Sequence, residues 1–200
     1  RWIQTHHEAD RYPPTEATIR AARRAYLAMT SYIDDQVGRF LGELDRLGAT
    51  DDTVVVFTSD HGDMQGEHGM WYKRTFREWS MRIPLIVADP RLGAGGAGVV
   101  DSPVSLVDLF PTLTEIGGAE SDWQGATELD GESLVPLMRG DATRADRVFY
   151  GEYCGEGTVQ PMRVVRRGRY KYVAVGGHSP LLFDLEEDPV EEHNLAGTSS

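Results

Sequence analysis

The longest periodic pattern of apolar positions lies in the first quarter of the chain. Thr15 fits the N-cap of a helix, Glu16 its first turn, and Gly48 the residue that ends it. We therefore expect one long helix between them with one buried face. The apolar residues recur in steps of three and four, as one helix face requires: Ile19, Ala22, Tyr26, Met29, Ile33, Val37, Phe40, Leu44 and Leu47.

Two short apolar runs follow this helix, at residues 54–57 and 82–87. Runs of this length, bounded by polar or turn residues, are typical of strands buried on both faces of a mostly parallel sheet. The order of helix and then strand predicts an α/β layer. The first run is too apolar for an edge strand, so we expect it to have neighbours on both sides.

The pattern changes again toward the C-terminus. Residues 106–116 predict a helix with Pro111 near its first turn, and residues 134–138 predict a helical turn. Short β-rich runs then predict an antiparallel sheet, with a hairpin turn at 167–169: residues 148–150, 162–165, 170–173 and 181–183. We expect two parts, an α/β part at residues 1–140 and a small antiparallel β subdomain with an acidic tail at 141–200.

Composition narrows the class of protein. The net charge of −12, from 20 basic and 32 acidic residues, argues against non-specific binding to nucleic acid. No apolar run approaches the roughly 20 residues that span a bilayer, and the first residues lack the apolar segment of a signal peptide. Cys154 is the single cysteine, so there is no internal disulfide. We expect a cytoplasmic protein with no membrane partner.

Ionisable residues gather directly after the first predicted strand. Asp60 and His61 stand where open α/β sheets bind ligands, just beyond the carboxyl end of a strand. A carboxylate beside an imidazole can bind a metal ion, and Gly62 lets the backbone turn close to a ligand. A simple polar turn is the alternative interpretation. Packing alone does not explain the ionisable residues that follow: Asp63, Glu67, His68 and Lys73.

Four segments in the same order resemble one known family. TSDHGDMQGEHGMWYKRTFREWSMRIPLIV is similar to the C-terminal signature of the sulfatase family in the alkaline phosphatase superfamily. The other segments similar to this family are YLAMTSYIDDQVGRFLGELDRLG, SLVDLFPTLTEIGG and RRGRYKYVAVGGHSPLLFDLEEDPVEEHNLAG. Within the family, GEYCGEGTVQPMRVVRRGRYKYV is most similar to the choline-sulfatase branch. The resemblance covers nearly the whole chain. It implies the C-terminal part of an alkaline-phosphatase-like α/β/α sandwich, whose catalytic domain includes residues 1–140, followed by the small antiparallel β subdomain.

The resemblance also implies roles for the residues after the first strand. Asp60 and His61 would bind a divalent metal ion, with Ca²⁺ favoured by the carboxylate and Mn²⁺ admitted by the imidazole. Lys73 would contact a sulfate oxygen or the leaving group. His68 is the candidate acid–base residue, with a scaffolding role in the loop as its alternative. Glu67 is expected to orient the loop through backbone donors.

One part of the expected active site has no counterpart in the sequence. Sulfatases make their formylglycine nucleophile from the Cys of a Cys-x-Pro-x-Arg motif, and Cys154 does not lie in such a motif. The resemblance therefore implies that the chain is the C-terminal part of a longer enzyme, with the formylglycine in the N-terminal part. We expect residues 1–200 alone to be inactive.

The substrate is expected to be a small sulfate ester. Glu152, Tyr153 and Glu156 are candidate substrate-binding residues, because aromatic faces and carboxylates bind quaternary ammonium groups. A strand end with solvated acids is the alternative. Choline-O-sulfate is the favoured substrate. The other functions kept open are a phosphonate or phosphate ester hydrolase and a non-catalytic metal-binding scaffold. The full-length enzyme is expected to be a homo-oligomer that binds no nucleic acid.

Overall fold

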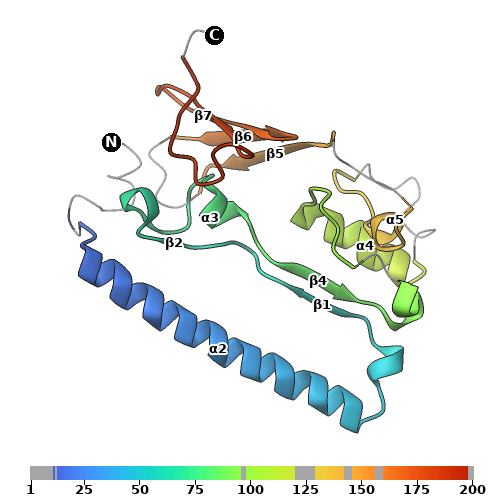
Figure 1. Ribbon diagram of the computed structural model, residues 1–200. Coiled ribbons are helices and arrows are strands. Elements are labelled where there is room, and N and C mark those ends of the chain that lie inside the picture. The colour runs from blue at the N-terminus through green and yellow to red at the C-terminus, as the bar shows by residue number, and fades with distance from the viewer. Residues whose placement is uncertain are drawn as a thin grey trace.

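The computed structural model describes residues 11, 13–95, 98–119, 129–141, 146–155 and 160–197. A long helix runs beside a two-stranded sheet, and a four-stranded sheet lies beyond them, with the shorter helices between the two sheets (Figure 1). The helical elements are α2 (Glu16–Arg46), η1 (Thr50–Asp52), η2 (Glu67–Gly69), α3 (Glu78–Met81), η3 (Pro90–Gly95), η4 (Leu106–Asp108), α4 (Leu109–Ile116) and α5 (Val135–Met138). The strands are β1 (Val55–Thr58), β2 (Met64–Gln65), β3 (Trp71–Tyr72), β4 (Leu85–Ala88), β5 (Val148–Tyr153), β6 (Met162–Arg167), β7 (Tyr170–Val175) and β8 (Leu181–Asp184).

The long helix α2 begins and ends where the sequence predicts. Thr15 is its N-cap: its hydroxyl accepts from Thr18 N–H at 3.2 Å, and Thr18 Oγ1 accepts from Thr15 N–H at 2.9 Å. Gly48, just past the helix, has a φ of 67°, the left-handed conformation that glycine adopts without strain. Among the residues that the structure describes, no helix is both long and apolar enough to cross a bilayer.

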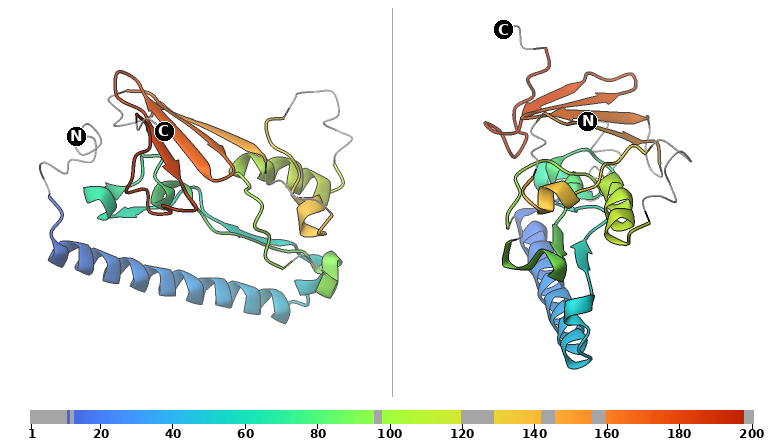
Figure 2. Two further views of the ribbon diagram at one scale, coloured as in Figure 1. Left: turned by 45° about the horizontal axis from the view of Figure 1, so that its top comes forward. Right: turned by 90° about the vertical axis from the view of Figure 1, so that its right-hand side faces the viewer.

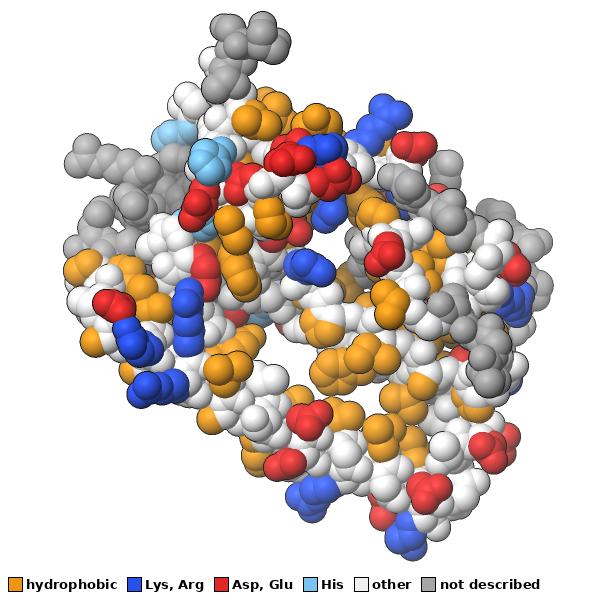
Figure 3. Space-filling model, viewed as in Figure 1, with side chains coloured by type: hydrophobic (Ala, Val, Ile, Leu, Met, Phe, Trp, Pro, Cys, Tyr) orange, Lys and Arg blue, Asp and Glu red, His pale blue; other side chains and the backbone are white. Residues whose placement is uncertain are grey.

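The predicted buried face of α2 is wrong for this chain, because no residue of the helix is buried. Near the C-terminal end of the helix, Leu41 and Leu44 line one side of an open hollow of about 910 Å³, opposite β4 and α5. Figure 3 shows openings between the ridge of α2 and the rest of the molecule, so the helix packs loosely along its length. Side chains such as Ile33 and Phe40 remain 50% and 56% exposed. The period of three and four marked an apolar face correctly, but the described chain covers it only in part, as where Ile19 lies against Gly66.

The central sheet also differs from the prediction. β1 pairs with β4 in antiparallel register, with Val55 opposite Ala88 and Thr58 opposite Leu85. The expected mostly parallel sheet is therefore not formed by the described residues, and β1 has one neighbour where we expected two. Each residue of β1 is half-buried. The apolar composition of β1 indicates a strand meant to be covered on both faces, and the described chain covers them only in part. Composition does not indicate whether a strand runs parallel or antiparallel to its neighbour.

The C-terminal strands lie where the sequence predicts. β5, β6, β7 and β8 form an antiparallel sheet in chain order, with the hairpin turn between Arg167 and Tyr170. Its inner face carries the core that packs against Phe76: Met162, Val164, Val173 and Val175. The two views of Figure 2 show this sheet stacked over the segment that contains α3. The boundary of the β subdomain near residue 141 stays a prediction.

A buried ion pair joins η4 to the segment that enters β5. Asp108 is fully buried, and Arg147 donates to both of its carboxylate oxygens, at 2.5 and 2.6 Å. Burial opposes ionisation of Asp108, yet the guanidinium of Arg147 and the amide N–H groups of Glu132 and Ser105 hold its pKa below the ordinary value. The pair thus fixes the C-terminal sheet to the helical layer.

Candidate active site

The turn that follows β1 is held by its own polar groups. Ser59 Oγ donates to the carbonyl oxygen of His61 at 2.8 Å. Asp60 Oδ1 accepts from His61 N–H at 3.0 Å. These short-range bonds fix the directions of the Asp60 and His61 side chains before any ligand is present, which is the local order that a binding site requires.

Gly62 is the point at which this turn rests on α3. Its N–H donates to Ser80 O at 2.8 Å. A Cβ atom on Gly62 would lie 2.1 Å from Trp79 O, closer than any real contact. Gly62 is therefore needed for the close packing of this turn on α3, and its expected approach to a ligand stays a prediction.

His61 and Lys73 are in direct contact. Lys73 Nζ lies 2.6 Å from His61 Nε2. A lysine ammonium has three donors and no acceptor, so Nε2 must accept and the ring proton must lie on Nδ1. His61 Nδ1 accordingly donates to Gly62 O at 2.8 Å. The residue that follows His61 thus selects its tautomer.

Asp60 completes the cluster. Its Oδ2 lies 3.5 Å from His61 Nε2, and its side chain is 82% exposed. A carboxylate oxygen and an imidazole nitrogen at this separation can both reach one metal ion, and the backbone-bound Nδ1–H is the usual support of a metal-binding histidine. The two side chains therefore fit a divalent ion. Among the described residues, no three His, Cys, Asp or Glu side chains group around such a site. At this turn, the described residues bring together two of the about six ligands that a hard cation takes.

Backbone strain gathers around Lys73. His68, Tyr72 and Arg74 have φ values of 52°, 65° and 79°, and they are three of the four such non-glycine residues in the described chain. Conformations of this kind cost on the order of 1–3 kcal/mol each and persist where the surroundings impose them, often at functional sites. The loop that carries Lys73 is thus held in a conformation that it would not adopt alone.

Glu67 contributes to this restraint from inside the loop. Its Oε2 accepts from Gln65 N–H at 2.5 Å, and its Oε1 pairs with Arg23 of α2 at 2.6 Å. Glu67 therefore orients the loop through a backbone donor, as expected, and also ties the loop to the long helix.

His68 points elsewhere. Its Nε2 lies 2.9 Å from Val190 O in the C-terminal tail, so its hydrogen bond does not go to Asp60, His61 or Lys73. The structure gives His68 a place at the junction of the loop and the tail. Its acid–base role stays a prediction.

The two described candidates for substrate binding, Glu152 and Tyr153, point to opposite faces of the C-terminal sheet. Glu152 accepts from Arg163 Nε at 2.6 Å and from the Tyr150 hydroxyl, and these hydrogen bonds hold its pKa below the ordinary value. Tyr153 is the next residue on β5, so its side chain points to the other face of the sheet, where it packs against the core. Glu156 lies outside the described residues.

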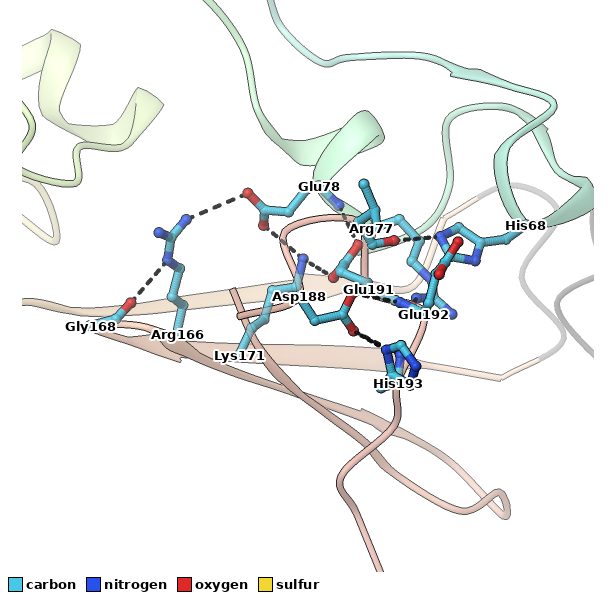
Figure 4. A network of polar contacts seen from close by, with 11 residues as sticks. His68, Arg77, Glu78, Arg166, Gly168, Lys171, Asp188, Glu191, Glu192 and His193 are labelled. Carbon is cyan, nitrogen blue, oxygen red and sulfur yellow. Dashed lines mark hydrogen bonds and ion pairs between the residues drawn. The ribbon is translucent and has the colours of Figure 1, made fainter. Parts of the chain in front are cut away.

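The sequence interpretation missed an ionic cluster behind the loop, drawn in Figure 4. Lys171, Glu191, Glu78 and Arg77 meet there across the C-terminal sheet, the tail and α3. A signal was available: strand alternation places Lys171 inward together with Val173 and Val175. A lysine at an inward position demands a buried carboxylate partner.

Comparisons with known proteins give a consistent answer. The profile described as "Sulfatase" matches residues 2–119, and the profile described as "N-sulphoglucosamine sulphohydrolase, C-terminal" matches residues 66–200. The chain is 41% identical over 182 residues to a choline-sulfatase of Rhizobium meliloti, covering 91% of this chain and 34% of the relative. It is 35% identical over 219 residues to arylsulfatase K of Xenopus laevis, covering 98% of this chain and 39% of the relative.

Comparison with solved structures also points to the alkaline phosphatase superfamily. The phosphonate monoester hydrolase of Agrobacterium radiobacter superposes with a TM-score of 0.76 at 33% identity, over 88% of this chain and 37% of that chain. The chain thus spans little more than a third of the length of the relatives that it matches. The matched profile covers more than half of the residues, and the likeness in fold extends over most of the rest. The chain belongs to the sulfatase family of the alkaline phosphatase superfamily.

Proposed function

We propose that the chain is the C-terminal third of a metal-dependent hydrolase that cleaves sulfate monoesters. The observation that carries this proposal is the contact cluster of Asp60, His61 and Lys73 at the end of β1. A carboxylate, an imidazole nitrogen and an ammonium within direct reach of one another suit a doubly charged metal ion and a sulfuryl group. The share of each relative that is matched, 34% and 39%, supports the view that a longer enzyme contains this chain.

Asp60, His61, Gly62 and Lys73 would have different roles in the reaction. Asp60 Oδ2 and His61 Nε2 would hold the divalent ion, Ca²⁺ or Mn²⁺, which supplies charge neutralisation at the sulfuryl oxygens. Gly62 keeps the ring proton of His61 on Nδ1, so that Nε2 stays available as a ligand. Because the ion would occupy the lone pair of Nε2, the ammonium of Lys73 would be free to donate to a sulfuryl oxygen or to the leaving oxygen. The strained loop would hold the ammonium of Lys73 close to the sulfuryl oxygens and to the leaving oxygen.

Choline-O-sulfate is the favoured substrate within this class. The support is the choline-sulfatase relative at 41% identity. We propose that Glu152, Tyr153 and Glu156 contribute to binding the cationic end, with Glu152 kept ionised by Tyr150 and Arg163. A phosphonate or phosphate ester hydrolase is the second candidate, because the phosphonate monoester hydrolase shares the fold at 33% identity.

Removing Asp60 tests the proposed reaction. In the complete enzyme, Asp60→Ala should lower the divalent-metal content and nearly abolish turnover, because a charged ligand is lost. His61→Asn should be milder and should shift the preference toward Ca²⁺, since an amide oxygen replaces the imidazole nitrogen. Elemental analysis and sulfate release measure both effects. Unchanged metal content in Asp60→Ala would refute the assignment of Asp60 as a metal ligand.

A substrate comparison decides between the candidates. Glu152→Gln and Glu156→Gln should raise KM for choline sulfate more than for a neutral aryl sulfate, because each removes a negative charge that would attract the cationic end of the substrate. A phosphonate monoester serves as the third substrate. Equal effects on the two sulfates would point to a general sulfatase. Faster turnover of the phosphonate by the unmodified enzyme would favour the second candidate. No turnover of any ester, with metal bound, would favour a non-catalytic scaffold.

A further inference from the structure

A buried ion cluster lies behind the candidate active site. Lys171 Nζ, on β7, is 2.7 Å from Glu78 Oε1 and 2.5 Å from Glu191 Oε1. The side chains of Lys171 and Glu191 have no exposed surface. Figure 4 shows the ammonium pointing between the two carboxylates. Because desolvated charges are costly unless they are fully paired, the loss of one partner leaves the others uncompensated. These residues therefore hold one another in a single arrangement.

The C-terminal tail is bent into this cluster. Glu191 has a φ of 60°, in the left-handed region that is strained for a residue with a side chain. Arg77 Nη1 donates to Glu191 O at 2.5 Å, and its guanidinium lies 4.8 Å from the centre of the Phe183 ring. The hydrogen bond between His68 and Val190 O is a second contact between the tail and this loop. The tail is thus attached to both ends of the segment that carries Lys73.

The cluster reaches the metal-binding turn through α3. Glu78 is the first residue of α3, and its N–H donates to Glu191 Oε2 at 2.8 Å. At the other end of this one-turn helix, Ser80 O accepts from Gly62 N–H, and Trp79 O fills the space beside the Gly62 α-carbon. Gly62 follows His61 directly. A displacement of Glu78 therefore moves the surface on which the Asp60–His61 turn rests.

We propose that Glu191 and Lys171 are positioning residues for the cluster of Asp60, His61 and Lys73. They act through α3 and touch neither substrate nor metal. Their buried charges hold the start of α3, α3 supports Gly62, and Arg77 holds the far end of the Lys73 segment. The catalytic side of this inference rests on the proposed sulfatase function, whereas its structural side does not.

Amide hydrogen exchange in the complete enzyme tests the structural side, because its readout does not depend on turnover. Glu191→Gln removes the charge opposite Lys171, and Glu191→Asp keeps the charge but shortens the arm to Glu78. Exchange at Glu78 and at Gly62 should speed up by about tenfold in Glu191→Gln, and by less in Glu191→Asp, relative to amides of the sheet core, because the hydrogen bond from Glu78 N–H to the carboxylate no longer resists opening of α3 to the same extent. The milder Glu191→Asp keeps the test decisive if Glu191→Gln does not fold.

Asp108→Asn is the matched control. Asp108 is equally buried, pairs with one cation and accepts from two backbone amides, but it does not touch α3. This variant should speed exchange at Ser105 and Glu132 and leave Gly62 unchanged relative to the core. Exchange at Gly62 that is the same in the Glu191 variants as in the unmodified chain would overturn the proposal.

Kinetics of the complete enzyme test the catalytic side. Glu191→Gln should lower kcat by about 10- to 100-fold with a small change in KM, as expected when reacting groups are displaced by a fraction of an ångström to 1 Å. Glu191→Asp should recover part of the loss, and Asp108→Asn should keep kcat when compared at equal folded fraction. A normal kcat in Glu191→Gln would refute the catalytic role. An enzyme without sulfatase activity would refute the proposed function and leave the exchange result standing.

Discussion

Lys73 shows how far a single residue determines the chemistry of this site. Its ammonium sits at 2.6 Å from His61 Nε2, the same nitrogen that we assign to the metal ion. A lysine at this position can hold the ring ready as an acceptor and can then turn its donors toward an anionic substrate. The lysine and the metal ion cannot use the same lone pair, so binding of the ion should release Lys73 for catalysis.

Replacement of this lysine gives the prediction at the residue scale. Lys73→Ala should reduce kcat of the complete enzyme by roughly 10²–10³-fold, the scale observed when a donor to a developing anion is removed. Circular dichroism should be unchanged, because the side chain holds no secondary structure. Steady-state kinetics on a sulfate ester measure the effect. A variant with near-normal kcat would show that Lys73 does not act on the reacting group.

At the scale of elements, the turn after β1 and α3 form one unit. The turn supplies Asp60 and His61, and α3 supplies the backbone carbonyls that receive Gly62. Neither element is long enough to be stable alone, since a helix of one turn has little intrinsic stability. Their packing against each other is therefore the source of order at the site.

Gly62 gives the test of this unit. Gly62→Ala places a methyl group 2.1 Å from Trp79 O, so the turn or α3 must shift. We expect metal binding to weaken and the free energy of unfolding to fall, by about 1–3 kcal/mol as for other overpacked sites. Gly38→Ala is the control, because its added Cβ meets nothing within 4 Å in the middle of α2. That variant should gain about 0.5–1 kcal/mol in stability. Equal effects at both positions in urea unfolding would contradict the packing role of Gly62.

The elements that the sequence predicted well are those fixed by local patterns. Thr15 capped the long helix as its side chain suggested, and the C-terminal strands followed the alternation of apolar residues. The pairing of β1 with β4 could not be predicted, because an apolar run does not encode strand direction. The exposed face of α2 could not be predicted either, since periodicity marks an apolar face and says nothing about what covers it.

For the site, local sequence was informative only within one loop. Asp60, His61 and Lys73 were brought together as predicted by their closeness in the chain and by family resemblance. Glu191 was missed because its contact with Glu78 spans 113 positions of sequence. The outward direction of Glu152 and the inward direction of Tyr153 follow from strand alternation, which places neighbours on opposite faces. Their proposed joint role in substrate binding therefore needs the kinetic test described above.

At the scale of the whole molecule, buried ion pairs fasten the C-terminal sheet to the rest. Asp108 with Arg147 holds one end, and Lys171 with Glu78 and Glu191 holds the other. Hydrophobic packing at this junction includes the core cluster around Met162, which packs against Phe76. The attachment of the sheet should therefore depend on the ionisation of carboxylates.

Acid should loosen this attachment. The pKa of Asp108 is below the ordinary value of 3.8, so the unfolded chain binds a proton more readily than the folded one. Its contribution is complete above pH 3.8 and is lost as the pH falls through the lower pKa of the folded state. The pKa of Asp188 is also lowered: burial opposes ionisation, but hydrogen bonds from the amides of His193 and Glu192 outweigh it. Asp188 should therefore also stabilise the fold less as the pH falls.

Urea unfolding at a series of pH values measures this dependence. The free energy of unfolding of the unmodified chain should drop steeply below pH 4. Asp108→Asn should be less stable at neutral pH, by up to about 3–5 kcal/mol for a broken buried pair. Its stability should also change less between pH 4 and pH 2. If the free energy of unfolding falls equally in Asp108→Asn and in the unmodified chain between pH 4 and pH 2, ionisation of Asp108 is not what stabilises the fold.

The link between Glu191 and α3 also sets an order of events during synthesis. A ribosome adds about 5–20 residues per second, so the 113 positions between Glu78 and Glu191 take roughly 6–23 s to translate. During this interval Asp60, His61 and Lys73 have all been made, but the carboxylate that fixes α3 has not. The turn with Asp60 and His61 should therefore reach its native arrangement only after the tail has left the ribosome. A message cut before the codon for Glu191 should yield a protein that contains Asp60, His61 and Lys73 without that arrangement.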